Sequence, residues 1–166
     1  KISKVGKQPI IGTQINISEN NIIGKITLYA TTEKGYKNLT KLSSLSYLKS
    51  KETEGPSCKI SDLISNNEDL ILLTGNYYNF FGKLFYANKS KDFVKILTSL
   101  KSIFKDRLYL EIQRHNENEE KNFENYLLNC SKTLDIPLIA TQEIFYLNSN
   151  MYEAHDALTC IGEKNS

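Results

Sequence analysis

Apolar and polar residues alternate along two neighbouring stretches near the start of the chain. Residues 9–17 begin as an apolar run and end in alternation, and residues 23–31 show a similar pattern after the polar stretch 18–21. Alternation with a period of two is typical of strands that bury one face. We therefore predict two strands, and the short turn between them favours a hairpin.

The apolar period then changes from that of a strand to that of a helix. Leucines recur at every third position after Glu33-Lys34-Gly35, which predicts a helix of about 14 residues with one apolar face. Residues 49–58 are polar and contain Gly55-Pro56, so we expect a surface loop there. Residues 60–64 predict a further short helix. The leucines of the longer helix are Leu39, Leu42, Leu45 and Leu48.

Strands and helices alternate through the second half of the chain. We predict strands at residues 69–74, 107–113 and 136–141. The four-residue apolar run in the first of them indicates burial on both faces, as in a parallel sheet. Alternation of this kind indicates an α/β layer with parallel strands, although the strands are too few to close an eight-stranded barrel.

Three amphipathic helices complete this half. The first and second have one apolar face each, and the third, over residues 149–161, is expected to turn Ala154, Leu158 and Ile161 inward. Residues 75–82 are expected to form an aromatic loop, and Asn116 with Glu119 resembles a capping box before the second helix. The first two apolar faces comprise Phe93, Ile96, Leu97, Leu100, Ile103 and Phe104, and then Phe123, Tyr126, Leu127, Cys130 and Leu134.

Composition limits the classes of function. The 166 residues are 40% hydrophobic and 24% charged, which is typical of one soluble globular domain or part of one. The net charge of +2 gives no support to a dedicated nucleic-acid or anionic-membrane surface. No apolar stretch approaches the ~20 residues that a membrane span needs, and we find no signal peptide. The chain does not begin with Met and stops directly after a helical pattern, so we expect both ends to be cut.

Three cysteines, Cys58, Cys130 and Cys160, stand at wide and irregular spacings. An odd number without a CxxC pair indicates neither a disulfide framework nor a zinc site. We expect a reducing cytoplasm. Cys130 lies on the apolar face of its predicted helix, so we expect it to pack in the core, and Cys160 similarly.

Six segments, in order and at suitable spacings, resemble the PHP (polymerase and histidinol phosphatase) domain of bacterial replicative DNA polymerase III alpha subunits. The late segment ATQEIF is similar to the alphaproteobacterial version, which carries a Phe there. The resemblance covers nearly the whole chain. The segments are QPIIG at 8–12, LYA at 28–30 with EKGYKNL at 33–39, DLILLTG at 69–75, YLEIQRH at 109–115, PLIAT at 137–141 and YEAHDAL at 152–158, running to Cys160-Ile161-Gly162.

The resemblance implies a fold and a kind of site. PHP domains form a distorted (β/α)7 barrel, so residues 1–166 are expected to be an incomplete barrel, truncated at the N-terminus, with the first strands and the polymerase core missing. Active members hold divalent metals at the C-terminal mouth of the barrel through His, Asp, Glu and Cys side chains. They use these metals to hydrolyse phosphoesters, which in some polymerases supplies proofreading.

The family's metal-ligand positions fall at five residues of this chain. Gln14 would be a weak neutral ligand, Lys25 carries a charge that repels a cation, and Phe145 has no donor atom. Only His115 and Glu143 could coordinate a metal. We therefore expect a degenerate metal site, with no catalytic residue in this stretch and no cofactor. The positions are Gln14, Lys25, His115, Glu143 and Phe145.

Other candidate residues have a functional and a structural interpretation. Glu111 and Glu143 could act together as paired carboxylates in acid–base chemistry, although a solvated or salt-bridged pair is the simpler interpretation. His155 is expected to pack or cap against the preceding loop, and His115 to bond locally unless it is a remaining metal ligand. An aromatic cluster could stack bases, but we favour packing onto the barrel or another domain. The cluster comprises Tyr77, Tyr78, Phe80 and Phe81.

The resemblance predicts that the chain is part of a DNA-directed DNA polymerase, with Mg²⁺ in a separate palm domain of the parent protein. This part would be a structural accessory module. Its expected partners are the rest of the alpha chain, the proofreading exonuclease subunit and DNA within the holoenzyme, with no membrane involved. The alternative functions are a metal-dependent PHP phosphoesterase and a scaffold without a polymerase.

Overall fold

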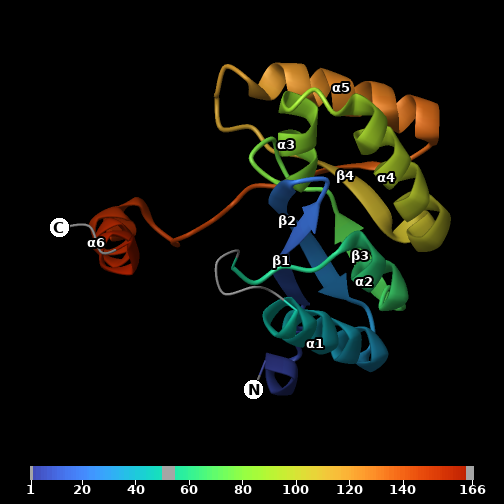
Figure 1. Ribbon diagram of the computed structural model, residues 1–166. Helices are drawn as coiled ribbons and strands as arrows, with labels where there is room; N and C mark the ends of the chain where they lie inside the picture. The colour runs from blue at the N-terminus through green and yellow to red at the C-terminus, as the bar shows by residue number, and fades with distance from the viewer. Residues whose placement is uncertain (1, 50–54, 164–166) are drawn as a thin grey trace.

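A five-stranded mixed sheet forms the centre of the protein, in the order β1-β2-β3-β4-β5 (Figure 1). The computed structural model describes residues 2–49 and 55–163. The strands are β1 (Ile11–Glu19), β2 (Ile22–Ala30), β3 (Leu70–Leu73), β4 (Leu108–Ile112) and β5 (Leu138–Ala140). The helices are α1 (Glu33–Leu48), α2 (Ile60–Ser65), α3 (Phe80–Tyr86), α4 (Ser90–Phe104), α5 (Glu120–Leu134) and α6 (Tyr152–Glu163), with short 3-10 helices at Ile2–Val5, Lys105–Arg107 and Ser149–Met151.

The predicted hairpin is confirmed, because β1 and β2 pair antiparallel along their whole lengths. Its turn is tighter than expected. Ser18 and Glu19 still belong to β1, and only Asn20 and Asn21 form the turn, with φ angles of 50° and 60°. Asparagine tolerates this left-handed conformation better than most residues, so two of them suit a two-residue hairpin turn.

Strand β3 joins an antiparallel and a parallel half of the sheet. It pairs antiparallel with β2 and parallel with β4, and β4 pairs parallel with β5. The predicted parallel arrangement of the last three strands is therefore confirmed. The predicted burial of the β3 run holds for Leu70, Leu72 and Leu73, whereas Ile71 is half-buried on the open side.

One face of the sheet carries the hydrophobic core. The apolar periodicities of α1, α4 and α5 bring their buried side chains onto this face, which confirms the predicted helices. Figure 1 shows these helices close to the sheet. The sheet contributes Ile15, Ile17, Ile26, Leu28, Leu72, Leu108 and Leu110, and the helices contribute Leu39, Leu42, Phe93, Leu97, Leu100, Phe123, Leu127 and Cys130.

The opposite face of the sheet is lined by a second set of apolar side chains. Tyr29, Ile71, Leu73, Tyr109 and Ile139 line a groove there, together with the segment before β1. None of α1 to α5 contributes a side chain to this groove within the part of the chain described. The sheet therefore has one helix-covered face and one open apolar face.

The predicted loop over residues 75–82 is confirmed for residues 75–79 and wrong for 80–82, because α3 begins at Phe80. Phe80 and Phe81 are fully buried, and the Phe81 ring lies 5.2 Å from that of Phe93 on α4 in an edge-to-face arrangement. Only Tyr78 of the aromatic cluster is exposed. Burial of two large aromatic side chains stabilises this helix of about two turns, which is too short to show a period of its own.

The prediction of a capping box at Asn116 and Glu119 is also wrong. Helix α5 begins at Glu120, and Glu119 makes no side-chain capping bond. The carboxylate of Glu120 instead accepts the backbone N–H of His115 at 2.7 Å and that of Glu117 at 3.2 Å. This buried carboxylate therefore fixes the loop that leads from β4 into α5.

The expected surface loop at residues 49–58 falls largely outside the described residues, which exclude 50–54. Its end is not on the surface. Cys58 is buried and extends the sheet by bonding to β1, since its N–H donates to the Asn16 carbonyl and its carbonyl accepts from the Ser18 N–H, both at 2.8 Å. The predicted short helix is confirmed as α2.

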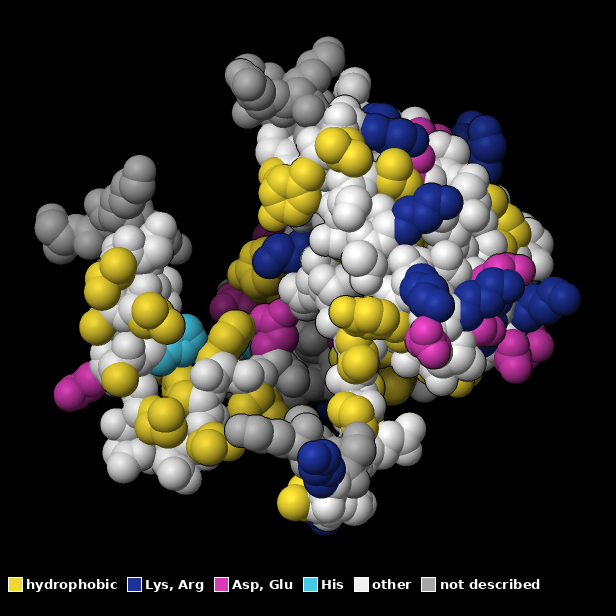
Figure 2. All heavy atoms as spheres, turned by 90° about the horizontal axis from the view of Figure 1, so that it is seen from below, with side chains coloured by type: hydrophobic (Ala, Val, Ile, Leu, Met, Phe, Trp, Pro, Cys, Tyr) yellow, Lys and Arg dark blue, Asp and Glu magenta, His cyan; other side chains and the backbone are white. Residues whose placement is uncertain are grey.

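Helix α6 stands apart from the rest of the protein at the end of an extended segment (Figure 1). The expectation that its apolar side turns inward is wrong, because Leu158 and Ile161 are 70% and 75% exposed. Cys160 is half-buried and not part of the core. Figure 2 shows apolar side chains over this detached segment. His155 packs on Phe145, with ring centroids 5.1 Å apart, which confirms its predicted packing against the preceding segment.

Within the described ranges, no helix has the length and apolar character needed to cross a membrane.

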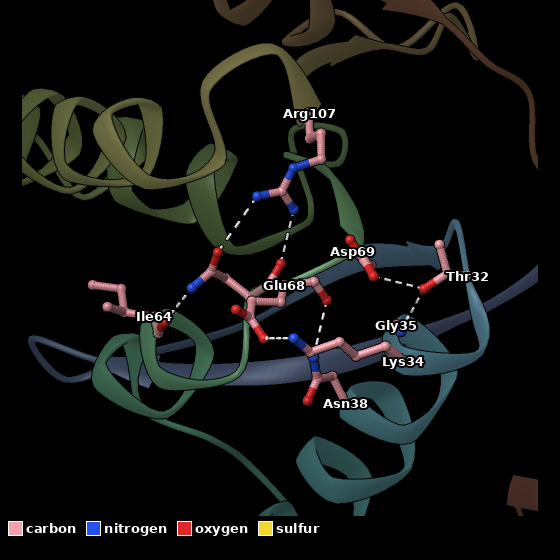
Figure 3. A network of polar contacts seen from close by, with 9 residues as sticks. Thr32, Lys34, Gly35, Asn38, Ile64, Glu68, Asp69 and Arg107 are labelled. Atoms are coloured by element: carbon pink, nitrogen blue, oxygen red, sulfur yellow. Dashed lines mark hydrogen bonds and ion pairs between the residues drawn. The ribbon is translucent and has the colours of Figure 1, made fainter.

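Polar contacts hold the amino end of β3 in place (Figure 3). The Arg107 guanidinium donates to the carbonyl oxygens of Asn67 and Leu70 at 2.8 and 2.6 Å. The Asp69 carbonyl, at a residue with a φ of 55°, accepts from the N–H of Thr31 at 3.0 Å. These bonds join the turn before β3 to β4 and to the start of α1.

We expect Arg107→Ala to lower the free energy of unfolding by about 2 kcal/mol, because two charge-assisted hydrogen bonds to carbonyl oxygens are lost. Urea denaturation followed by circular dichroism measures this difference. Lys91→Ala removes the same charge from an exposed site on α4 and should change the stability by less than about 0.5 kcal/mol. Equal effects of the two substitutions would show that the Arg107 contacts do not stabilise the turn.

Candidate functional site

Polar side chains gather where the three parallel strands end. Thr74, Gln113 and Thr141 each come directly after β3, β4 and β5, and Glu111 lies within the last residues of β4. Because the carboxyl ends of parallel strands lie at one edge of a sheet, these residues meet there. We call Thr74, Glu111, Gln113 and Thr141, with Asn76, the strand-end network.

Glu111 is the centre of the strand-end network and is only 4% exposed. One carboxylate oxygen accepts the backbone N–H of Gly75 at 3.0 Å. The other accepts from the Gln113 amide at 3.1 Å and from the Thr141 hydroxyl. Three uncharged donors therefore replace the water that this carboxylate loses on burial.

Gln113 links Glu111 to the rest of the edge. Its amide nitrogen also contacts the Thr141 hydroxyl at 2.9 Å, and its carbonyl oxygen accepts from Asn76 at 2.7 Å. The same oxygen lies 3.3 Å from Nε2 of His115. Since that oxygen can only accept, the contact is a hydrogen bond when Nε2 of His115 carries a proton, and it then occupies this nitrogen.

A polar groove of about 280 Å³ lies beside the strand-end network, between the β1–β2 hairpin and the turn that leads into α3. We call it the hairpin groove. Lys25 and Glu143 both line it although they are far apart in the sequence. Its other lining residues are Asn16, Gly24, Asn76, Tyr78, Asn79 and Lys83.

Comparison with known proteins establishes the family. The model of the PHP domain matches residues 1–115. The chain belongs to the PHP domain family. The predicted resemblance is therefore confirmed.

The similar proteins are much longer than this PHP chain. It is 37% identical over 159 residues to the DNA polymerase III subunit alpha of Rickettsia bellii, and 36% identical over 168 residues to that of Caulobacter vibrioides. Each alignment covers 95% of this chain and 14% of the relative. The subunit of Vibrio cholerae is 28% identical over 159 residues. The chain spans about one seventh of the length of these relatives.

The positions at which the family resemblance predicts metal ligands are only partly brought together. Lys25 is opposite Asn16 in the hairpin, and Gln14 is opposite Thr27; both side chains are exposed. Glu143 shares the hairpin groove with Lys25, whereas His115 belongs to the strand-end network. Phe145 is 70% exposed and packs on His155.

These residues match poorly the donor set that a PHP metal centre needs. A metal ligand must offer a lone pair, and the Lys25 ammonium and the Phe145 ring offer none. Nε2 of His115 and both oxygens of Glu111 are already engaged with neutral partners. Residues 2–49 and 55–163 contain no group of three or more His, Cys, Asp or Glu side chains arranged to hold a metal ion.

Glu111 and Glu143 have different surroundings. Glu111 is buried among hydrogen-bond donors, and Glu143 is exposed at the hairpin groove. The salt-bridged interpretation is wrong for Glu111, whose carboxylate makes bonds to neutral groups only among the described residues. Paired acid–base chemistry by these two residues stays a prediction.

Sequence reasoning missed most of the strand-end network. Thr74, Asn76, Gln113 and Thr141 were not singled out, because isolated amides and hydroxyls carry no motif. Their common feature is position, since all four follow a parallel strand within three residues. Polar residues at the carboxyl ends of successive predicted strands would have been the signal to follow.

The Tyr77 hydroxyl is buried beside the strand-end network without a hydrogen-bond partner among the described residues. Burial raises the pKa of this phenol above its ordinary value, so the hydroxyl is neutral at pH 7. We expect Tyr77→Phe to raise the free energy of unfolding by about 1 kcal/mol, because an unsatisfied polar group is removed from the interior.

Thermal and urea unfolding of Tyr77→Phe test this expectation. Tyr47→Phe is the control, because Tyr47 is 70% exposed and its hydroxyl can be solvated. A loss of stability in Tyr77→Phe alone would mean that the hydroxyl has a partner in solution.

Proposed function

We propose that the chain is the PHP-domain part of a replicative DNA polymerase III alpha subunit. The parent protein would be a DNA-directed DNA polymerase, in which Mg²⁺ in a separate palm domain serves nucleotidyl transfer. The support is the match of nearly the whole chain to several alpha subunits. The relatives' greater length leaves room for the other domains of such a polymerase.

The proposed fold of the parent domain is a distorted (β/α)7 barrel to which residues 1–166 contribute one portion. The open apolar face of the sheet supports this proposal. Tyr29, Leu73 and Tyr109 are arranged on it as side chains in the interior of a barrel would be. Further strands of a longer chain would cover this face.

Within the polymerase, this portion would act as a structural accessory module with a degenerate metal site. The single observation that carries this proposal is the strand-end network, in which neutral donors surround the Glu111 carboxylate. Lys25 adds a positive charge to the neighbouring groove, which disfavours a divalent cation there.

The proposed partners are the remainder of the alpha chain, the proofreading exonuclease subunit and, through the holoenzyme, DNA. The proposed compartment is the cytoplasm, where replication proteins of bacteria act. These proposals rest on the similarity to alpha subunits.

The second candidate is a metal-dependent PHP phosphoesterase. His115 and Glu143 favour it, because both retain donor atoms at positions where the family resemblance predicts ligands. Rotation of His115 away from Gln113 would free its Nε2. A metal ion bound there could activate water for attack on phosphorus.

Hydrolysis of bis-p-nitrophenyl phosphate by the purified chain separates the two candidates. We expect no hydrolysis above buffer with Mn²⁺ or Zn²⁺. Activity that EDTA abolishes and that His115→Ala removes would establish the phosphoesterase and contradict the structural role.

The polymerase assignment is tested by sequencing the coding region on both sides of this stretch. We expect the reading frame to continue into a palm domain with paired aspartates. A stop codon soon after Ser166, with no palm, would contradict the assignment and leave a free PHP protein.

A further inference from the structure

The hairpin groove combines positive charge and an aromatic ring that come from separate elements of the fold. Lys25 comes from β2, Lys83 from α3, and Tyr78 from the turn between β3 and α3. The turn between β3 and α3 contains no lysine. The hairpin places Lys25 beside this aromatic turn.

The charges of the groove leave it net positive. Lys25 makes no ion pair with any residue that the structure describes. The Lys83 ammonium donates to the Ile23 carbonyl at 2.8 Å, which anchors it at the groove and leaves two of its N–H groups for a ligand. Glu143 is the one acidic lining residue, so two positive charges face one negative charge.

An amide side chain also lines the groove. Asn79 makes no side-chain hydrogen bond to the N-terminus of α3, and neither of its amide atoms is both buried and unpaired. The amide therefore reaches the solvent in the groove, where it can hydrogen-bond to a polar group of a ligand.

Tyr78 offers a flat surface next to these polar groups. Its side chain is 59% exposed, and one side of its ring lies against Tyr77, with ring centroids 3.9 Å apart. The backing by Tyr77 holds the ring in place and leaves its other side accessible. A planar base can stack on such a ring whatever its sequence.

We propose that the hairpin groove binds a nucleotide without a metal ion, with the phosphate on Lys25 and Lys83, the base on Tyr78 and a polar edge of the ligand on Asn79. The nucleotide is either free or the phosphorylated end of a single strand, since both present the same chemistry. The inference rests on the groove alone and does not depend on the polymerase assignment. It is a binding site, with no bond made or broken.

Titration of the 166-residue chain with dAMP in the presence of EDTA, followed by isothermal calorimetry, is the test. We expect saturable binding that weakens about fivefold in Lys25→Gln, because one charge-assisted contact to phosphate is lost. Lys41→Gln is the matched control, since it removes the same charge from an exposed position on α1. Glu143→Gln should tighten binding, because it removes the only lining carboxylate.

Two further measurements separate the parts of the proposal. Tyr78→Leu should weaken dAMP binding about tenfold, through loss of stacking, and leave the weaker binding of inorganic phosphate unchanged. A pentathymidylate with a 5′-phosphate distinguishes the sources: affinity above that of dAMP indicates a strand end, and equal affinity a free nucleotide.

Absence of dAMP binding, or equal affinities in Lys25→Gln and Lys41→Gln, would overturn the proposal. Circular dichroism of each variant establishes that the fold is retained. If Lys25→Gln fails to fold, the affinity of Glu143→Gln for dAMP decides the question. The proposal requires this variant to bind dAMP more tightly than the unchanged chain, and equal or weaker binding would overturn it.

Discussion

Glu111→Ala is expected to lower the free energy of unfolding by about 3 kcal/mol, one of the largest effects of any single substitution of a polar residue here. The substitution leaves the Gly75 N–H, the Gln113 amide and the Thr141 hydroxyl without their common acceptor. Glu111 is 4% exposed, so water can replace the carboxylate only in part. Urea denaturation of the variant measures the difference.

Two variants define what the Glu111 result means. Glu111→Gln keeps one acceptor oxygen and places an N–H₂ opposite a donor. Its free energy of unfolding should therefore lie between that of the unchanged protein and that of Glu111→Ala. Glu143→Ala removes an exposed glutamate and should cost less than about 0.5 kcal/mol. If Glu111→Ala is no less stable than Glu143→Ala, the strand-end network does not hold the edge of the sheet together.

Gly82→Ala is expected to destabilise the protein by about 3 kcal/mol, because the added methyl group has no space. A Cβ at Gly82 would lie 2.0 Å from the Tyr77 carbonyl oxygen and 2.3 Å from two further backbone atoms of Tyr77. The turn before α3 would have to move away from the helix. That movement would also disturb Phe80 and Phe81 in the core.

Gly162→Ala is the matched control for this prediction, because a Cβ there meets no atom within 4 Å. Alanine favours a helix over glycine by up to about 1 kcal/mol, so this change in α6 should be neutral or slightly stabilising. Thermal unfolding of both variants gives the comparison. A Gly82→Ala protein as stable as Gly162→Ala would mean that α3 does not pack against Tyr77 as described.

Long periodic segments could be predicted from the sequence, whereas short ones could not. Helix α4 repeats its apolar residues over four turns, so the face that packs against the sheet can be predicted from the sequence. Helix α3 has seven residues, and its adjacent aromatics show no period. Tertiary burial of Phe80 and Phe81 decides its conformation, and that packing involves residues distant in sequence such as Phe93.

The apolar side of α6 could be predicted from the sequence, but the exposure of that side to solvent could not. Periodicity predicts that a helix has an apolar side; it does not say what covers that side. Leu158 and Ile161 keep the expected spacing and are nevertheless exposed. The same limit applies to Cys160, which shares this helix.

The candidate site was predictable only where the family resemblance assigns positions. That resemblance singled out Lys25, His115 and Glu143, and the fold places Lys25 and Glu143 at one groove. The contacts of Gln113 with Glu111, Thr141 and His115 depend on the register of β4 and β5. Register is set by the whole sheet, so a single sequence does not reveal such a network.

Equilibrium dialysis of the purified chain against Mn²⁺ and Zn²⁺, followed by elemental analysis, tests most directly whether this PHP portion has lost its metal site. We predict metal contents well below one equivalent per chain, the same in the unchanged protein and in His115→Ala. One or more tightly held equivalents, lost in His115→Ala or Glu143→Ala, would contradict the account and establish a working metal site.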